Sequence, residues 1–161
     1  MIRAAVLTIS DRSHRRERPD ISGPAVCDLC ARNHWRVVLA EILPDEQAPI
    51  AARLCALADS NDVDLILTTG GTGVAPRDVT PEATRSILQR EIPGLGELMR
   101  AEGLKSTRYA PLSRSLAGIR GRTLIVNLPG SPKGAVESLS AIVGLVPHIV
   151  RLLAGETGHP E

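Results

Sequence analysis

Aromatic side chains are almost missing from this chain: its 161 residues include one Trp, one Tyr and no Phe. The core must therefore be aliphatic, and a surface that stacks nucleic-acid bases on aromatic rings is nearly excluded. An excess of one charge is missing too, since the formal net charge is +1. Because proteins that bind nucleic acid usually carry a basic patch, we expect no nucleic-acid partner.

Cysteines and long apolar runs are also scarce. Three cysteines do not make a disulfide framework. Cys27 and Cys30 form a C-x-x-C pair, but zinc would need a second pair of ligands at compatible spacing, so we interpret them as small core or surface thiols. No apolar run reaches the length of a membrane span, and residues 1–7 lack the features of a signal peptide. We expect a cytoplasmic protein with no membrane partner.

Several catalytic fingerprints are absent from the sequence. Neither glycine-rich loop has the G-x-x-x-x-G-K-[ST] pattern of a P-loop, and residues 71–76 fail at the third glycine of G-x-G-x-x-G. The four histidines form no H-E-x-x-H motif, and no G-x-S-x-G elbow occurs. Hydride transfer, hydrolase triads and metalloprotease chemistry are therefore unsupported.

What the chain does contain is an alternation of apolar runs and amphipathic segments. The runs predict strands at residues 4–9, 36–43, 65–69, 117–120 and 123–128. Helices are predicted to begin at residues 22, 46 or 47, 80, 93, 132 and 146. This order predicts an α/β fold: a mostly parallel sheet with a short antiparallel edge and helices on both faces, in one domain over residues 1–161.

Local signals add detail to three of these helices. Ser22 and Thr80 occupy positions typical of helix caps, each with a proline close behind. For the helix at residues 132–143, the spacing predicts an inward face of Val136, Leu139 and Val143. Between the first strand and the first helix, residues 12–20 are expected to form a polar loop in which Arg12 can reach an anionic ligand.

The stretch from residue 65 to residue 84 carries the main functional signal. A strand-like run leads into Gly70, Gly71, Thr72 and Gly73, and Asp78 follows before a helix start. Backbone N–H groups of such a turn bind anions, and the helix N-terminus adds its positive dipole end. Asp78 places a carboxylate where a metal bridging phosphates could bind. The arrangement predicts a phosphate site at the carboxyl edge of the sheet.

Asp45 is a second acid that follows a predicted strand. It could cap the helix that begins at residue 46 or 47, or it could act at the same sheet edge as Asp78. Sequence position alone leaves both interpretations open.

Four motifs in order give the chain a family resemblance. T-G-G-T-G with R-D-V-T-P-E-A-T spans residues 69–84, and I-S-D-R, L-P-D-E-Q and L-P-G-S-P-K occupy residues 9–12, 43–47 and 128–133. Together they resemble the Mog/MoaB family of molybdenum cofactor biosynthesis, which includes the N-terminal domain of gephyrin. The resemblance implies a three-layer α/β/α fold and a homotrimer. The chain departs from the family in the charged run at residues 15–18, where many members have glycine.

The resemblance also implies an activity, molybdopterin adenylyltransferase. Such enzymes transfer AMP from Mg-ATP to the terminal phosphate of molybdopterin, release pyrophosphate, and hand the product to a molybdenum insertase. Matching by motif implies that Asp45 and Asp78 are the catalytic residues and the Mg²⁺ ligands. It assigns molybdopterin and its phosphate to Ser10, Gly70, Gly71, Thr72, Gly73, Pro129, Gly130, Ser131 and Lys133.

The residue set suits this chemistry. A phosphate nucleophile is already anionic near neutral pH, so the lack of a well-placed histidine is no objection, and the obstacle is repulsion between polyanions. Lys133, one of two lysines, is expected to contact phosphate. A non-catalytic molybdopterin-binding or scaffold protein is the alternative function, and a domain of the insertase itself is disfavoured because its other domains are missing.

Overall fold

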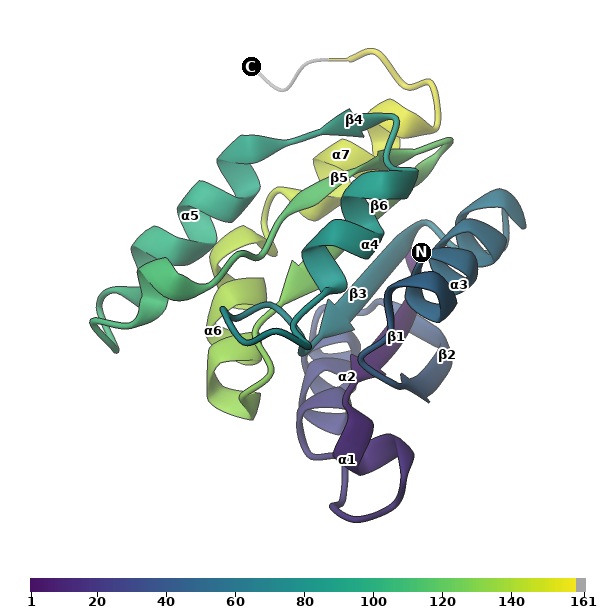
Figure 1. Cartoon of the computed structure of the whole chain (residues 1–161). Coiled ribbons are helices and arrows are strands. Elements are labelled where there is room, and N and C mark those ends of the chain that lie inside the picture. The colour runs from purple at the N-terminus through teal and green to yellow at the C-terminus, as the bar shows by residue number, and fades with distance from the viewer. Residues whose placement is uncertain (159–161) are drawn as a thin grey trace.

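The computed structural model describes residues 1–158, in which six strands form one sheet (Figure 1). The strand order is β2-β1-β3-β6-β5-β4. The strands are β1 (Arg3–Ile9), β2 (Arg36–Leu43), β3 (Leu65–Thr69), β4 (Arg90–Glu91), β5 (Ala117–Arg120) and β6 (Thr123–Leu128). All five predicted strands are confirmed, and β4 is an addition that the sequence did not signal.

The first four strands in this order run parallel, and their carboxyl ends meet at one edge. The register pairs Ile9 with Leu43, Thr8 with Thr69, and Thr69 with Leu128. The loops that follow these four strands therefore start at nearly the same level. β5 and β4 are antiparallel additions on the far side of β6, which confirms the predicted mixed sheet.

Helices cover both faces of the sheet and make three layers (Figure 1). α2 (Ser22–Arg32), α5 (Pro93–Gly103), α6 (Pro132–Ile142) and α7 (Val146–Leu153) pack on one face. α3 (Gln47–Asp59) and α4 (Thr80–Ile87) pack on the other. The structure also contains the short helix α1 (Asp11–His14) and the 3-10 turn η1 (Ala110–Leu112).

The core is aliphatic, as the composition predicted. Two clusters lie on the two faces of the sheet, one around Leu67, Val126 and Leu139 and one around Leu7 and Ile66. Trp35 is buried at the rim of the first cluster, whereas Tyr109 is exposed. Burial of these apolar side chains supplies the main driving force for folding.

Two predicted helix caps are wrong, and the reasons bear on the site. Ser22 lies inside α2, and the N–H of Gly23 donates to the Asp20 carboxylate at 3.0 Å instead. Thr80 is the first residue of α4 rather than its cap. Its hydroxyl donates to the Gly70 carbonyl at 3.0 Å, so it fixes the glycine loop.

Two further local predictions need correction. Residues 12–20 are not loop throughout, because α1 makes a helical turn that Ser10 caps by accepting the Ser13 N–H at 3.2 Å. In α6 the buried face consists of Ala135, Ser138, Leu139 and Ile142. Val136 and Val143 are only partly buried, because the helix is rotated by about one residue from the predicted face.

The environment of the cysteines agrees with the interpretation of Cys27 and Cys30 as small core or surface thiols. Among the described residues Cys27, Cys30 and Cys55 are free, and burial raises the pKa of the Cys30 thiol to about 12. An inert core thiol fits this environment. Within residues 1–158 no single helix is long and apolar enough to span a membrane. Only α6 and α7 taken together reach that length and apolar composition, and a 63° bend separates them.

Candidate active site at the carboxyl edge of the sheet

A cavity of about 690 Å³ opens where the four parallel strands end. Loops after β1, β2, β3 and β6 contribute to its wall. Polar and glycine residues dominate the wall; they include Ser10, Asp11, Asp45, Gly70, Gly71, Asp78, Gly130 and Ser131. The sheet topology therefore brings together motifs that lie as far apart as residues 10 and 131, as expected for an α/β site.

Asp11 and Asp45 join the loops after β1 and β2. The N–H of Asp11 donates to Asp45 Oδ2 at 2.9 Å, and the N–H of Asp45 donates to Asp11 Oδ1 at 3.0 Å. The capping interpretation of Asp45 is wrong, because no side chain caps α3 and the Asp45 carboxylate lines the cavity. Burial raises the pKa of Asp45, with the nearby carboxylates of Asp11 and Asp78 adding to the effect.

Arg77, from the loop after β3, contacts Asp11 in the segment after β1. Its Nη2 donates to Asp11 Oδ1 at 3.0 Å, and its Nε donates to Oδ2 of the same carboxylate. The guanidinium holds the pKa of Asp11 below its ordinary value. Of the two acids that bond each other, Asp11 is thus charge-paired, whereas Asp45 remains a carboxylate that a cation could pair.

Two glycines allow the chain to turn sharply after β3. Gly70 and Gly71 have φ of +108° and +67°, which side chains of L residues rarely adopt. A Cβ atom on Gly70 would lie 2.2 Å from the Ile9 carbonyl, and one on Gly71 would lie 2.3 Å from Thr80 Oγ1. Both positions therefore require glycine, for backbone conformation and for space.

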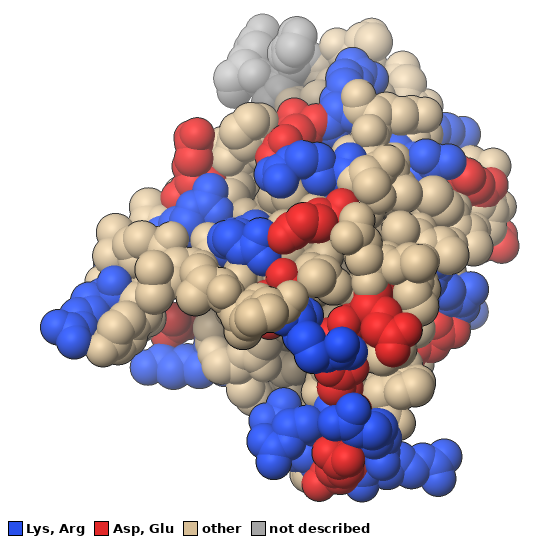
Figure 2. Space-filling view, viewed as in Figure 1, with Lys and Arg blue, Asp and Glu red and all other residues tan. Residues whose placement is uncertain are grey.

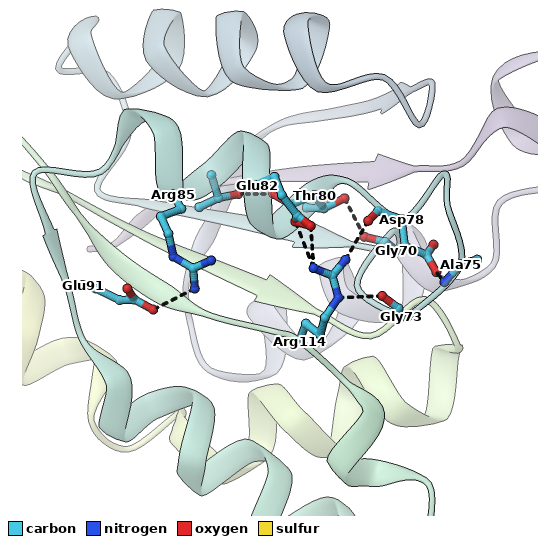
Figure 3. A network of polar contacts seen from close by, with 10 residues as sticks. Gly70, Gly73, Ala75, Asp78, Thr80, Glu82, Arg85, Glu91 and Arg114 are labelled. Atoms are coloured by element: carbon cyan, nitrogen blue, oxygen red, sulfur yellow. Dashed lines mark hydrogen bonds and ion pairs between the residues drawn. The ribbon is translucent and has the colours of Figure 1, made fainter.

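Residues 74–77 are exposed, and Arg114 holds the half-buried residues Gly73 and Asp78 at the two ends of this segment (Figure 3). Arg114 lies between η1 and β5, and its Nε and Nη2 donate to the carbonyls of Gly73 and Asp78. Its Nη1 pairs with Glu82 in the first turn of α4. The Asp78 carboxylate itself accepts the Ala75 N–H at 2.9 Å.

The carboxylates of Asp45 and Asp78 fit a Mg²⁺ ion. Each uses Oδ2 to accept a backbone N–H, and no donor among the described residues contacts either Oδ1. A Cβ on Gly71 would lie 3.0 Å from Asp45 Oδ1, so this glycine keeps the space beside that carboxylate open. Residues 1–158 hold no cluster of three metal-ligating side chains, and Mg²⁺ typically takes one or two carboxylates with water and phosphate.

Arginines surround the outer part of the cavity. Arg12, Arg15 and Arg18 line it, and all three are exposed. Figure 2 shows blue side chains gathered at the end of the molecule where α1 lies. Arg15 is paired with the Glu17 carboxylate at 3.0 Å. This rim can attract a polyanion toward the carboxylates inside. Arg12 lines the cavity, but it lies in α1 and not in the loop predicted from the sequence.

A second, smaller cavity of about 170 Å³ lies between α5, η1 and α6. Pro129 and Ser131 belong to its wall, and Ser131 also lines the larger cavity. Apart from Arg100 and Glu137, the rest of the wall is apolar or neutral; it includes Met99, Gly103, Tyr109, Ala110 and Ser138. The loop after β6 therefore separates a charged cavity from a less polar one.

The structure gathers most of the residues predicted for the site. Asp45, Asp78, Ser10, Gly70, Gly71, Gly130 and Ser131 line the larger cavity. Thr72 and Gly73 belong to the same loop but do not line this cavity, and Thr72 is buried. Lys133 stands apart: its side chain is 79% exposed and lies 3.8 Å from the Glu137 carboxylate.

Sequence reasoning missed several residues that build the site. Asp11 and Arg77 sit inside quoted motifs, so pairing acids with bases across the aligned loops could have suggested them. Arg114 gave no usable signal, because it lies in an irregular segment 36 residues from Asp78. The small cavity forms between helices whose spacing only the fold determines.

Comparisons with known proteins agree with this geometry. A family model described as a probable molybdopterin binding domain matches residues 5–148. A molybdopterin adenylyltransferase of Helicobacter pylori is 42% identical over 96% of this chain and 89% of its own length. The molybdenum cofactor synthesis protein cinnamon of Drosophila melanogaster is 46% identical over 94% of this chain, which spans only 25% of that protein.

A solved structure extends the match to three dimensions. The molybdopterin biosynthesis enzyme MoaB of Thermus thermophilus is 53% identical, with a TM-score of 0.91 over 96% of this chain and 98% of that one. The resemblance drawn from four motifs is thereby confirmed, since sequence, fold and the matched family model agree. The chain belongs to the Mog/MoaB family, whose shared unit is the probable molybdopterin binding domain.

Proposed function

We propose that this protein is a molybdopterin adenylyltransferase, which transfers AMP from Mg-ATP to the terminal phosphate of molybdopterin and releases pyrophosphate. One observation supports this most strongly. Asp45 and Asp78 reach the same cavity from two different strands, and each keeps one carboxylate oxygen unoccupied by donors of the described chain. A pair of this kind beside a glycine loop suits a metal–phosphate complex.

The chain's own residues address the main obstacle, which is repulsion between two polyanions. A terminal phosphate oxygen attacks the α-phosphorus of ATP, and the bond to the bridging α–β oxygen breaks, so that pyrophosphate leaves. Bound Mg²⁺ supplies charge neutralisation on the phosphates. Backbone N–H groups of the glycine loop and the arginines at the rim hold the phosphates in position. The nucleophile is anionic, so no general base is required.

The two cavities suggest how the substrates divide. The larger cavity, with its carboxylates and arginines, suits the triphosphate, so Ser10, Gly70 and Gly71 would face the nucleotide as well as the molybdopterin phosphate that the family motifs assign to them. The smaller one, lined by Met99, Tyr109 and Ala110, suits the flat pterin ring. Ser131 faces both cavities, so the terminal phosphate of molybdopterin would lie at the loop after β6, next to the α-phosphate of ATP.

Other parts of the proposal concern the cell and the assembly. The whole chain acts as one molybdopterin-binding domain in the cytoplasm, where Mg-ATP is available, and passes its product to a molybdenum insertase.

A homotrimer is part of the proposal. β2 is an edge strand with exposed Val38 and Ile42, which offer an apolar surface for such contacts. Sedimentation of the purified chain measures the oligomeric state.

Pyrophosphate release separates this function from the scaffold alternative. The purified chain is incubated with molybdopterin and Mg-ATP, and released pyrophosphate and bound pterin are both measured. An adenylyltransferase releases one pyrophosphate per adenylylated pterin. A chain that binds molybdopterin but releases none is a pterin-binding scaffold.

A further inference from the structure

Arg114 makes the main contacts between residues 73–78, called the Asp78 loop below, and the rest of the molecule. Its N–H donates to the Thr72 carbonyl at 2.8 Å, and its guanidinium donates to the carbonyls of Gly73 at 2.8 Å and Asp78 at 2.7 Å. One residue thus binds both ends of the loop. Figure 3 shows the guanidinium lying between the loop and Glu82.

Thr80 holds the base of this loop through its bonds to the Gly70 and Gly71 carbonyls, but few other contacts fix residues 73–78. The bonds from Asp78 N–H to the Ala75 carbonyl and from Ala75 N–H to the Asp78 carboxylate are internal to it. Residues 74–77 are exposed, and their external contact is the bidentate pair of Arg77, whose side chain is 61% exposed, with Asp11. Arg114 is half-buried, and hydrogen bonds from a charged donor are stronger than neutral ones.

The way Arg114 holds Asp78 leaves the acid free to act. It binds the main-chain carbonyl of Asp78, while its charge is balanced by the Glu82 carboxylate. The Asp78 side chain therefore forms no ion pair with Arg114 and lines the cavity. Because a guanidinium presents its donors in a fixed planar fork, it can serve Gly73, Asp78 and Glu82 at once.

We propose that Arg114 is a positioning residue for the adenylyl transfer proposed above. It fixes the backbone around Asp78 so that the carboxylate stays aimed at the place where the metal of Mg-ATP would bind. The inference rests on the proposed function for the role of Asp78, but the mechanical part, that Arg114 orders the loop, stands on the contacts alone. Glu82 is its partner in this role.

The test compares Arg114→Lys with Arg120→Lys. Arg120 is a matched control, because it also bridges a carboxylate and a carbonyl, those of Asp59 and Ile87, and it lines neither cavity. Lysine keeps the charge in both variants but loses the planar fork. Glu82→Gln is a milder second variant, which retains an acceptor for Arg114.

Three readouts follow the loop, the metal and the reaction. Amide hydrogen exchange of the ligand-free chain at residues 72–79 should be about tenfold faster in Arg114→Lys, the factor expected for one charged hydrogen bond. Mn²⁺ affinity in the presence of a non-hydrolysable ATP analogue should fall by a similar factor. The kcat of pyrophosphate release should fall, while KM for molybdopterin stays within about twofold. Arg120→Lys should change none of these, and Glu82→Gln should change them in the same direction but less.

Equal exchange rates and Mn²⁺ affinities in Arg114→Lys and Arg120→Lys would overturn the inference. A wild-type chain that binds no Mn²⁺ with the ATP analogue would instead contradict the proposed function. In that case the exchange comparison still decides whether Arg114 orders the loop.

Discussion

Asp11 and Asp45 bond each other symmetrically, with the main-chain N–H of each donating to the carboxylate of the other at 2.9 and 3.0 Å. The two carboxylates differ, however, in their electrostatic surroundings. Arg77 neutralises Asp11 and lowers its pKa, whereas burial raises the pKa of Asp45. Asp45 is therefore the carboxylate whose ionised form the fold disfavours, and a bound metal ion would stabilise that form.

Asp45→Asn should abolish AMP transfer and stabilise the metal-free protein. A carboxyl whose folded pKa is raised favours the protonated state, so its ionisation at neutral pH costs stability. We expect the melting temperature at pH 7 without Mg²⁺ to rise by about 2–4 °C, a gain limited by partial exposure. The gain should shrink as pH falls below the raised pKa of folded Asp45 and vanish below the ordinary pKa of an unfolded Asp, where the acid is neutral in both states. Thermal melts between pH 3 and pH 8 measure it, and a variant less stable than wild type at pH 7 would contradict the account.

Gly71→Ala should destabilise the protein and disturb the site. Its Cβ would lie 2.3 Å from Thr80 Oγ1 at a φ of +67°, and we expect a loss of about 2–4 kcal/mol in the free energy of unfolding. Gly121→Ala is the control, because Gly121 has a φ of +56° and nothing within 4 Å of an added Cβ. It should cost only about 1–2 kcal/mol for the backbone conformation. Equal losses in denaturant titrations would show that the contact with Thr80 is unimportant.

Lys133→Ala should weaken molybdopterin binding more than ATP binding. A mobile ammonium at the start of α6 can swing toward a phosphate at the loop after β6. We expect a loss of about three- to tenfold in pterin affinity. Lys105→Ala controls for removal of a lysine, since Lys105 is similarly exposed and paired with Glu102. Titrations in which ATP affinity falls more than pterin affinity would refute this role.

Ser138→Leu should block the pterin and spare the nucleotide. Ser138 is buried on α6 and lines the small cavity, so a larger side chain there would occupy the space assigned to the ring. We expect molybdopterin affinity to fall by about tenfold or more while affinity for the ATP analogue is kept. Ser140→Leu places the same change on the exposed side of the helix and should leave both affinities intact. Unchanged pterin binding in Ser138→Leu would place the ring elsewhere.

The sequence predicts the sheet well because its strands are apolar runs bounded by turn residues. Residues 65–69, 117–120 and 123–128 match β3, β5 and β6 residue for residue. β4 has two residues and is defined by its pairing with β5, so no periodicity could reveal it. The glycine loop, Asp45 and Asp78 could also be predicted from the sequence, because each follows a predicted strand within a motif.

The remaining parts of the site depend on contacts between distant segments. Arg114 meets Asp78 and Glu82 only after α5 and η1 have placed its segment beside the loop. The caps expected at Ser22 and Thr80 failed because other partners, three residues from Gly23 and ten residues from Thr80, took the same groups. Asp20 accepts the helix N–H, and Thr80 is drawn to the Gly70 carbonyl. Local sequence patterns describe the propensity of a residue to cap a helix, whereas contacts in the folded chain decide which hydrogen-bond partner it takes.

Transfer of label from ATP tests the central claim most directly, namely that Asp78 acts on the nucleotide and its metal rather than on the pterin. ATP labelled at the α-phosphate is incubated with molybdopterin, Mg²⁺ and either the wild-type chain or Asp78→Asn, with exposed Asp28→Asn as control. Wild type and Asp28→Asn should place the label on molybdopterin, and Asp78→Asn should place none there while still binding molybdopterin with wild-type affinity. Label transfer by Asp78→Asn, or loss of its molybdopterin binding, would contradict the account.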